Sequence, residues 1–248
     1  MSKSRLDQLL VERGLAETRT KAQALIMAGL VYQGEKKLDK AGQQFDDEIE
    51  LNVRGKEHPW VSRGGMKLAH AIDHFKLKVK DEVVADIGSS TGGFTDVLLH
   101  HGAAKVYAVD VGHGQLDVKL RHDSRVVVME ETNARNLTSE QIPDVLDSIV
   151  CDASFISLKK VLPAVMALAK PKAKLIALIK PQFEVGKEIV SRGKGVVRDA
   201  AIHHTVCEDI RHWIVEQGWE VQGITTSPIT GPKGNVEFLI YAVRGIIP

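Results

Sequence analysis

The chain's clearest grouping of residue types that could do chemistry begins near residue 83. Residues 83–87 form an apolar run that contains Asp86, and residues 88–93 that follow are glycines and small hydroxyl residues. The next apolar run ends at Asp110, 24 residues beyond Asp86. In nucleotide-binding sheets, an acid at the end of the second strand holds the hydroxyls of a ribose. The spacing therefore predicts a ribose-containing ligand at this strand-to-helix turn.

The residue types in the turn distinguish several ligands. A dinucleotide fingerprint needs a second glycine where Ser90 stands, because a pyrophosphate must come close to the backbone. Residues 88–92 also match the G-x-S-x-G elbow of hydrolases, but that elbow follows several strands, and here it follows the first strand of its sheet. A third interpretation is a pair of glycines that only tighten a corner. A turn without the second glycine, followed by Asp110, favours S-adenosylmethionine, which has no phosphate.

The residues predicted to bind this cofactor come from the turn, from the strand ends beside it and from the segment expected near the adenine. They are Asp86, Gly88, Ser89, Ser90, Gly92, Gly93, Phe94, Asp110, Asn133 and Asp152. A polar strand end such as the one at Asn133 is also a common surface feature. The aromatic side chains are otherwise expected in the core.

Four charged residues could supply catalysis beside this ligand. Asp152 and Lys180 end the fourth and fifth strand runs, Glu237 opens the final one, and Lys67 lies on the segment that enters the sheet. Taken singly, each is more often a solvated charge. Because the carboxyl ends of parallel strands share one edge, we expect all four to converge there. Such a set suits in-line methyl transfer to a weakly acidic ribose hydroxyl.

Each member of this set has a predicted role. Lys180 removes or accepts the hydroxyl proton, and Asp152 and Glu237 provide orientation. Nearby carboxylates oppose the loss of a proton from a lysine, whereas a second cation and desolvation favour it. Lys67 is therefore expected to lower the proton affinity of Lys180 and to hold the nucleotide.

The elements that must position these residues alternate between strand and helix from residue 83 onward. Strand runs end at Asp86, Asp110, Met129, Asp152 and Ile179, which predicts a parallel, doubly wound sheet. Runs 219–224 and 236–242 follow a helix over 200–217, and a turn-rich connection too short for a crossover helix makes them antiparallel. The predicted fold class is α/β, Rossmann-like, with a mainly parallel seven-stranded sheet and an antiparallel last strand.

The first 58 residues have a different pattern. Apolar residues at helical spacing predict helices over 4–14 and 18–28, and strands follow at 30–32 and 48–53. The pattern breaks at Pro59, because the residue before a proline is pushed out of helical geometry. We predict a small α+β domain over 1–58, a linker over 59–63 and the sheet domain over 64–248.

Composition limits the class of protein. The 248 residues are 44% hydrophobic, with a net charge of +1, so overall basicity gives no argument for nucleic acid. With two cysteines, no early apolar stretch and no apolar run near the roughly 20 residues of a membrane span, we expect a soluble cytoplasmic protein. We predict no metal site. A surplus of basic residues lies within residues 1–45, and a cationic loop follows residue 186.

Individual cations in these two regions and beside the site are candidates for contact with RNA phosphates. The predicted contacts are Arg5, Arg13, Arg19, Lys21, Arg63, Lys187 and Lys194. Charges on helix faces and in loops are also normally solvated, so the same residues fit a surface without a ligand.

Several motifs carry a resemblance to known families. Lys67, Asp152, Lys180 and Glu237 occur in the order of the Lys-Asp-Lys-Glu tetrad of FtsJ-like ribose 2′-O-methyltransferases. The segments Arg5-Leu-Asp, Gly14, Thr18-Arg19, Ala22, Leu25-Ile26, Gly29 and Gly34 resemble the RNA-binding domain named after ribosomal protein S-four. Over essentially the whole chain, the TlyA family is similar in Ser62-Arg-Gly-Gly-Met-Lys-Leu, Asp86-Ile-Gly-Ser-Ser-Thr-Gly-Gly-Phe-Thr-Asp, Lys180-Pro-Gln-Phe-Glu and Gly234-Asn-Val-Glu-Phe-Leu.

The resemblance implies a class I methyltransferase that uses S-adenosylmethionine to methylate cytidine 2′-hydroxyls of ribosomal RNA. The large subunit is the first candidate substrate and the small subunit the second, with no membrane and no metal as partners; the oligomeric state is left open. Because the family also carries the label haemolysin, a membrane-lytic protein is one alternative. An RNA-binding module without catalysis is the other.

Overall fold

The computed structural model describes residues 3–16, 18–54, 58–231 and 233–245, and Lys187 by its backbone only. The chain divides into two compact units, Met1–Pro59 and Trp60–Pro248, here called the N-terminal and C-terminal units. The boundary falls inside the predicted linker 59–63. Residues 60–63 pack with the C-terminal unit: Trp60 is buried, and the backbone N–H of Val61 donates to Asp96 Oδ2 at 2.9 Å.

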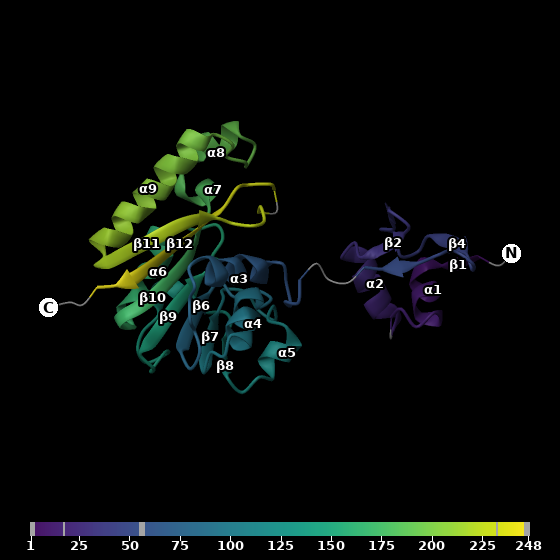
Figure 1. Cartoon of the computed structure of the whole chain (residues 1–248), viewed down its shortest axis with the longest axis horizontal. Coiled ribbons are helices and arrows are strands. Elements are labelled where there is room, and N and C mark those ends of the chain that lie inside the picture. The colour runs from purple at the N-terminus through teal and green to yellow at the C-terminus, as the bar shows by residue number, and fades with distance from the viewer. Residues whose placement is uncertain (1–2, 17, 55–57, 232, 246–248) are drawn as a thin grey trace. The chain divides into compact units, whose positions relative to one another are not determined.

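The N-terminal unit joins two helices to short strands (Figure 1). Its elements are β1 (Lys3–Arg5), α1 (Leu6–Glu12), α2 (Arg19–Met27), β2 (Val31–Gln33), β3 (Lys36–Lys37), β4 (Gln44–Asp46) and β5 (Asn52–Val53). β1 pairs with β4, and β2 lies between β3 and β5. Both helices, β2 and β5 were predicted, whereas β1, β3 and β4 were missed, because their residues are mostly polar and form no apolar run. Leu6, Leu10, Ile26 and Val31 are buried in the core of this unit.

The C-terminal unit alternates strands with helices, as predicted. Its elements are α3 (Gly64–His74), β6 (Val83–Ile87), α4 (Gly93–His100), β7 (Lys105–Val109), α5 (Val118–Arg121), β8 (Val126–Met129), η1 (Ala134–Asn136), β9 (Leu146–Cys151), α6 (Leu158–Ala167), β10 (Ala169–Ile179), α7 (Pro181–Glu184), α8 (Lys187–Arg192), α9 (Ala200–Glu216), β11 (Trp219–Thr226) and β12 (Phe238–Arg244).

These strands form one seven-stranded sheet in the order β11-β12-β10-β9-β6-β7-β8. β12 is antiparallel to both of its neighbours, and the other neighbouring strands pair in parallel. The predicted fold class, including the antiparallel last strand, is confirmed.

Helices cover both faces of this sheet (Figure 1). Side chains alternate along each strand, so Val84 packs on the face covered by α3 and α4, and Ala85 on the face covered by α6 and α9. Burial on both faces explains why the strands are nearly continuous apolar runs. Among the described residues, none of the helices is both long enough and apolar enough to cross a membrane.

Candidate active site

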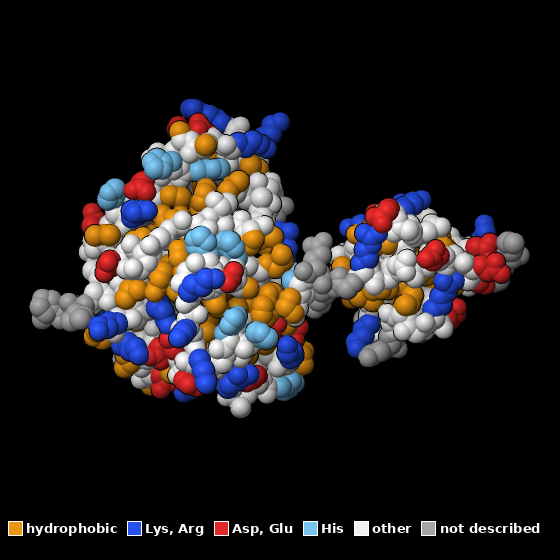
Figure 2. Space-filling model, viewed as in Figure 1, with side chains coloured by type: hydrophobic (Ala, Val, Ile, Leu, Met, Phe, Trp, Pro, Cys, Tyr) orange, Lys and Arg blue, Asp and Glu red, His pale blue; other side chains and the backbone are white. Residues whose placement is uncertain are grey.

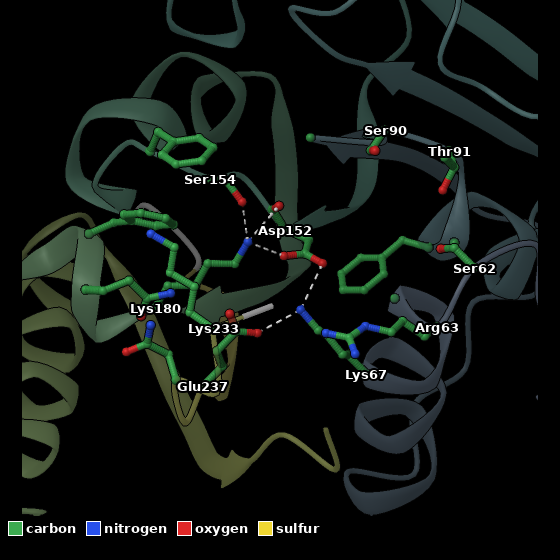
Figure 3. Close-up of a pocket in the computed structure, with 18 of the residues that line it drawn as sticks. Ser62, Arg63, Lys67, Ser90, Thr91, Asp152, Ser154, Lys180, Lys233 and Glu237 are labelled. Carbon is green, nitrogen blue, oxygen red and sulfur yellow. Dashed lines mark hydrogen bonds and ion pairs between the residues drawn. The ribbon is translucent and has the colours of Figure 1, made fainter. Parts of the chain in front are cut away.

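A cavity of about 600 Å³ lies at the carboxyl edge of the sheet in the C-terminal unit. The turn after β6 and the residues that follow β9 and β10 line it, together with the start of α3 and the segment before β12. In doubly wound sheets, ligands bind at this edge. The predicted catalytic residues Lys67, Asp152, Lys180 and Glu237 all line the cavity (Figure 3).

Two ion pairs share one carboxylate in this cavity. Lys180 Nζ lies 2.6 Å from Asp152 Oδ1 and donates to Ser154 Oγ at 2.8 Å. Lys67 Nζ donates to Glu237 Oε2 at 2.7 Å and lies 3.4 Å from Asp152 Oδ2 (Figure 3). Asp152 therefore bridges the two lysines.

Glu237, for which an orienting role was predicted, forms its ion pair with Lys67 in the part of the chain that the structure describes, so it can orient Lys67. Glu237 also precedes the last strand instead of opening it, because β12 starts at Phe238.

Burial makes these pairs necessary. The exposed fraction of the side chain is 1% for Glu237, 8% for Lys67, 7% for Lys180 and 18% for Asp152. A buried charge is tolerated when it is paired and hydrogen-bonded. Two cations and two anions balance one another, so the cluster can be buried as a unit.

Local structure sets each of these side chains in place. Lys67 lies in the first turn of α3, whose Gly65 has no room for a side chain, because a Cβ there would come within 2.6 Å of the Trp60 ring. Asp152 follows β9, and its N–H donates to Ile87 O at the end of β6 at 3.0 Å. Lys180 follows β10 and is the N-cap of α7.

The glycine turn lies directly beside Asp152. Gly88 has a φ of +80°, and a Cβ at this position would lie 2.9 Å from the backbone of Ala153. Ser90 has a φ of +46°, an uncommon conformation for a residue with a side chain. Its N–H donates to Asp110 Oδ2 at 2.8 Å, while Gly112 N–H donates to Asp110 Oδ1 at 2.7 Å. Each oxygen of Asp110 keeps a lone pair for a ribose hydroxyl.

Two buried polar atoms at the turn have no hydrogen-bond partner within the described ranges, and they indicate whether S-adenosylmethionine fits there. Asp86 is fully buried; its Oδ2 accepts from Thr95 Oγ1 at 2.7 Å, and its Oδ1 has no hydrogen-bond partner among the described residues. The hydroxyl of Ser89 is also buried without a partner in the part of the chain that the structure describes. Burial raises the pKa of Asp86 to about 7. Buried polar atoms normally have a partner, and the ammonium of a methionine moiety would supply a donor. These residues fit S-adenosylmethionine.

The other predicted cofactor residues divide into two groups. Gly88, Ser89, Ser90, Gly93, Phe94 and Asp152 line the cavity. Asp86, Gly92, Asp110 and Asn133 do not belong to its described lining. Asn133 is exposed, and its side chain accepts from Arg135 N–H at the start of η1, so it already has a local structural role.

The cations predicted to contact RNA in the N-terminal unit have partners within that unit. Arg5 Nε and Arg19 Nε lie 3.0 Å and 2.9 Å from the two carboxylate oxygens of Asp7, which is fully buried. These bonds hold the pKa of Asp7 well below its usual range. Arg13 donates to the backbone oxygens of Ile49 and Asp47. For Lys21, the backbone N–H, and not the cationic side chain, donates to Oγ1 of the N-cap residue Thr18 at 3.2 Å.

In the C-terminal unit, Arg63 lines the cavity and donates to Thr230 O at 3.1 Å. Lys194 is exposed on the loop after α8, where Figure 2 shows Lys and Arg side chains gathered. The side chain of Lys187 lies outside the described residues.

Sequence reasoning missed an aromatic pair at the cavity. Phe155 was expected in the core with the other aromatic residues, but it is 90% exposed and has a φ of +65°. Its ring centroid lies 5.1 Å from that of Phe183, and both residues line the cavity. The available signal was position, because each phenylalanine stands three residues after a charged residue at a strand end, Asp152 or Lys180.

Comparison with known proteins gives two family matches. The FtsJ-like methyltransferase family matches residues 60–244, and the S4 domain matches residues 4–48. The chain is 45% identical over 240 residues to "16S/23S rRNA (cytidine-2′-O)-methyltransferase TlyA" of Mycobacterium tuberculosis, covering 96% of this chain and 89% of that protein. It is 43% identical over 244 residues to "Hemolysin A" of Brachyspira hyodysenteriae, covering 96% and 99%.

Solved structures agree with the fold. The structure titled "Putative hemolysin from Streptococcus thermophilus" has a TM-score of 0.77 at 43% identity and covers 100% of this chain and 90% of that one. Magnesium protoporphyrin IX methyltransferase from Synechocystis, solved with bound S-adenosylhomocysteine, has a TM-score of 0.52 at 15% identity, over 73% of this chain and 82% of that one. The second likeness concerns the fold alone.

Proposed function

Because this chain belongs to the FtsJ-like methyltransferase family, we propose that it transfers the methyl group of S-adenosylmethionine to the 2′-hydroxyl of a cytidine in ribosomal RNA. One observation carries the proposal: Lys67, Asp152, Lys180 and Glu237 form a single buried cluster in the cavity that the glycine turn also lines. The printed name of the Mycobacterium tuberculosis relative supports the choice of cytidine and of ribosomal RNA.

The cofactor would be held by three parts of the chain. S-adenosylmethionine, when bound, supplies a methyl group on a positively charged sulfur that takes the electron pair when the methyl leaves. The turn from Gly88 to Phe94 would surround the methionine part, with the hydroxyl of Ser89 as a partner for its polar groups. Asp86, which lies beneath the turn and outside the described lining, would support the turn from below. Asp110 would accept from the ribose hydroxyls.

Lys180 would receive the proton of the hydroxyl. Lys180 would first release one proton to solvent. As the 2′-oxygen of the RNA then forms its bond to the methyl carbon, the O–H bond breaks, and the proton passes to Lys180 Nζ, which restores the balance of two cations and two anions. The ammonium that forms is stabilised at once by Asp152 Oδ1 at 2.6 Å and by Ser154 Oγ at 2.8 Å. These contacts also fix the direction in which Nζ points.

Lys67 and Glu237 would influence the proton transfer to Lys180 without contacting Lys180. Lys67 Nζ lies 3.4 Å from the second oxygen of Asp152 and competes for its negative charge. That competition weakens the hold of Asp152 on the proton of Lys180. Glu237, in turn, keeps Lys67 in position through the 2.7 Å hydrogen bond.

Cations and aromatic rings would hold the RNA. Arg63 and Lys233 line the cavity and would contact phosphates next to the target nucleotide. Phe155 and Phe183 offer ring faces to a base turned out of its stack, a common feature of RNA recognition. We place further phosphate contacts on the domain 1–58, at Arg5, Arg13, Arg19 and Lys21, and on the loop with Lys187 and Lys194.

The test is a map of 2′-O-methylation on ribosomal RNA from cells with and without this protein. We expect at least one cytidine to lose its methyl group without the protein and to regain it on expression of the wild type or of Lys160→Met, which changes an exposed lysine of α6. Lys180→Met should not restore it. An identical map in both strains would refute the proposal, and lysis of erythrocytes by the pure protein without S-adenosylmethionine would favour a membrane-lytic protein instead.

A further inference from the structure

Gln182 is a polar side chain of the cavity that the proposed transfer does not use. It lies in α7, between Lys180, which would receive the proton, and the half-buried Phe183, one of the two aromatic residues that line the cavity. Its side-chain oxygen, Oε1, is buried and has no hydrogen-bond partner among the described residues. A buried amide oxygen without a donor is unusual in a folded protein, and in a binding site a ligand can supply the donor.

The identity of the neighbours indicates what kind of ligand would supply it. Phe155 and Phe183 present apolar ring faces, so a flat aromatic group suits that side of the cavity. A base turned out of the RNA stack would place its ring on these faces and its hydrogen-bonding edge against polar side chains. A glutamine side chain offers one acceptor and one donor side by side.

We propose that Gln182 reads the base of the target nucleotide, accepting from the exocyclic amino group with Oε1 and donating to the adjacent ring nitrogen with Nε2. This inference rests on the proposed function, because it concerns the nucleotide whose ribose would lie at Lys180. Cytosine presents the required donor and acceptor side by side, as N4–H and N3. Uracil presents an acceptor, O4, where Oε1 needs a donor, and a donor, N3–H, where Nε2 needs an acceptor. This discrimination requires that the amide keeps one orientation, because a 180° rotation would exchange Oε1 and Nε2; the buried position of Oε1 is what would hold it.

The expected size of the effect follows from base recognition in general. A good bidentate contact between an amide side chain and a base discriminates against the wrong base by roughly tenfold to a hundredfold. Because the stacking faces and the lysine cluster are the same for both pyrimidines, the preference for cytosine should depend mainly on this amide.

The experiment compares two transcripts of ribosomal RNA that differ only at the mapped target position, which is cytidine or uridine. We measure kcat/KM for each with the wild type, with Gln182→Met and with Gln182→Asn. Methionine keeps the length of the side chain but has no amide, and asparagine keeps the amide but withdraws it by one methylene. Gln222→Met, at an exposed glutamine of β11, is the matched control.

We expect the wild type and the control to prefer cytidine roughly tenfold to a hundredfold, and both Gln182 variants to lose most of that preference by slowing on cytidine alone. Equal slowing on cytidine and uridine would show a structural role for Gln182 and overturn the inference, as would a wild type that does not distinguish the two transcripts. Neither of these results would contradict the proposed methyl transfer. If the wild type methylates neither transcript, the proposed function fails, and this inference fails with it.

Discussion

Removal of Lys67 should destabilise the C-terminal unit more than the loss of a surface lysine would. Glu237 is 1% exposed, and the 2.7 Å hydrogen bond to Lys67 is its recorded ion pair. In Lys67→Met, the carboxylate would stay buried without that partner. Removing one member of a buried pair typically lowers the free energy of unfolding by about 3–5 kcal/mol.

A double variant separates the cost of an unpaired buried carboxylate from the net contribution of the Lys67–Glu237 pair. Lys67→Met with Glu237→Leu removes both charges, and replacing a buried ion pair with apolar side chains is often close to neutral. We therefore expect this variant to unfold within about 2 kcal/mol of the wild type, although it should be as inactive as the single variant. Glu237→Gln should cost roughly 1–3 kcal/mol, because Lys67 keeps Asp152 at 3.4 Å and the new amide oxygen can still accept.

Urea unfolding followed by tryptophan fluorescence measures these differences. The three tryptophans, Trp60, Trp213 and Trp219, all belong to the C-terminal unit, so the signal reports that unit alone. Lys160→Met is the control and should change the free energy of unfolding by at most about 0.5 kcal/mol. The reasoning is wrong if Lys67→Met lowers the free energy of unfolding by less than about 1 kcal/mol. It is also wrong if the double variant loses as much free energy of unfolding as Lys67→Met and Glu237→Leu lose together when each is measured alone.

Three further predictions follow from the same cavity. Lys180→Met should slow methyl transfer by about 10²- to 10⁴-fold and leave the Kd of S-adenosylmethionine nearly unchanged; weaker binding with normal turnover would contradict the role of this lysine. Phe155→Ala should raise KM for RNA roughly tenfold to a hundredfold through the loss of stacking, whereas Phe155→Tyr should not; equal KM values in the two variants would argue against a stacked base. Because burial raises the pKa of Asp86 from 3.8 to about 7, its protonated form favours the folded state, and the stability that it contributes below pH 4 is lost as the pH rises through 7. In the wild type, about 3 kcal/mol of this loss falls between pH 5 and pH 8. Asp86→Asn should abolish it, so the free energy of unfolding should differ less between these two pH values for the variant than for the wild type.

Local patterns in the sequence determined the helices and strands of the C-terminal unit and the direction of its strands. Apolar strand runs that end in polar residues, with helices between them, predicted the parallel sheet and its antiparallel last strand, because strand and helix periodicity can be read within ten residues. They also indicated which residues lie at the carboxyl edge, since parallel strands share that edge. The family was recognised in the same way, from motifs that are each short and continuous.

Only the tertiary structure decided which side chains meet. Lys67 and Glu237 are 170 residues apart, and their pairing depends on the position of α3 relative to the segment before β12, which no local pattern contains. The exposure of Phe155 likewise depends on which segments pack around it. The same holds for the buried Asp7 of α1, whose partners Arg5 and Arg19 lie on β1 and α2. Burial and pairing are properties of packing between distant segments. The order of residues therefore determined where the charges lie along the chain, and the fold determined which of them meet.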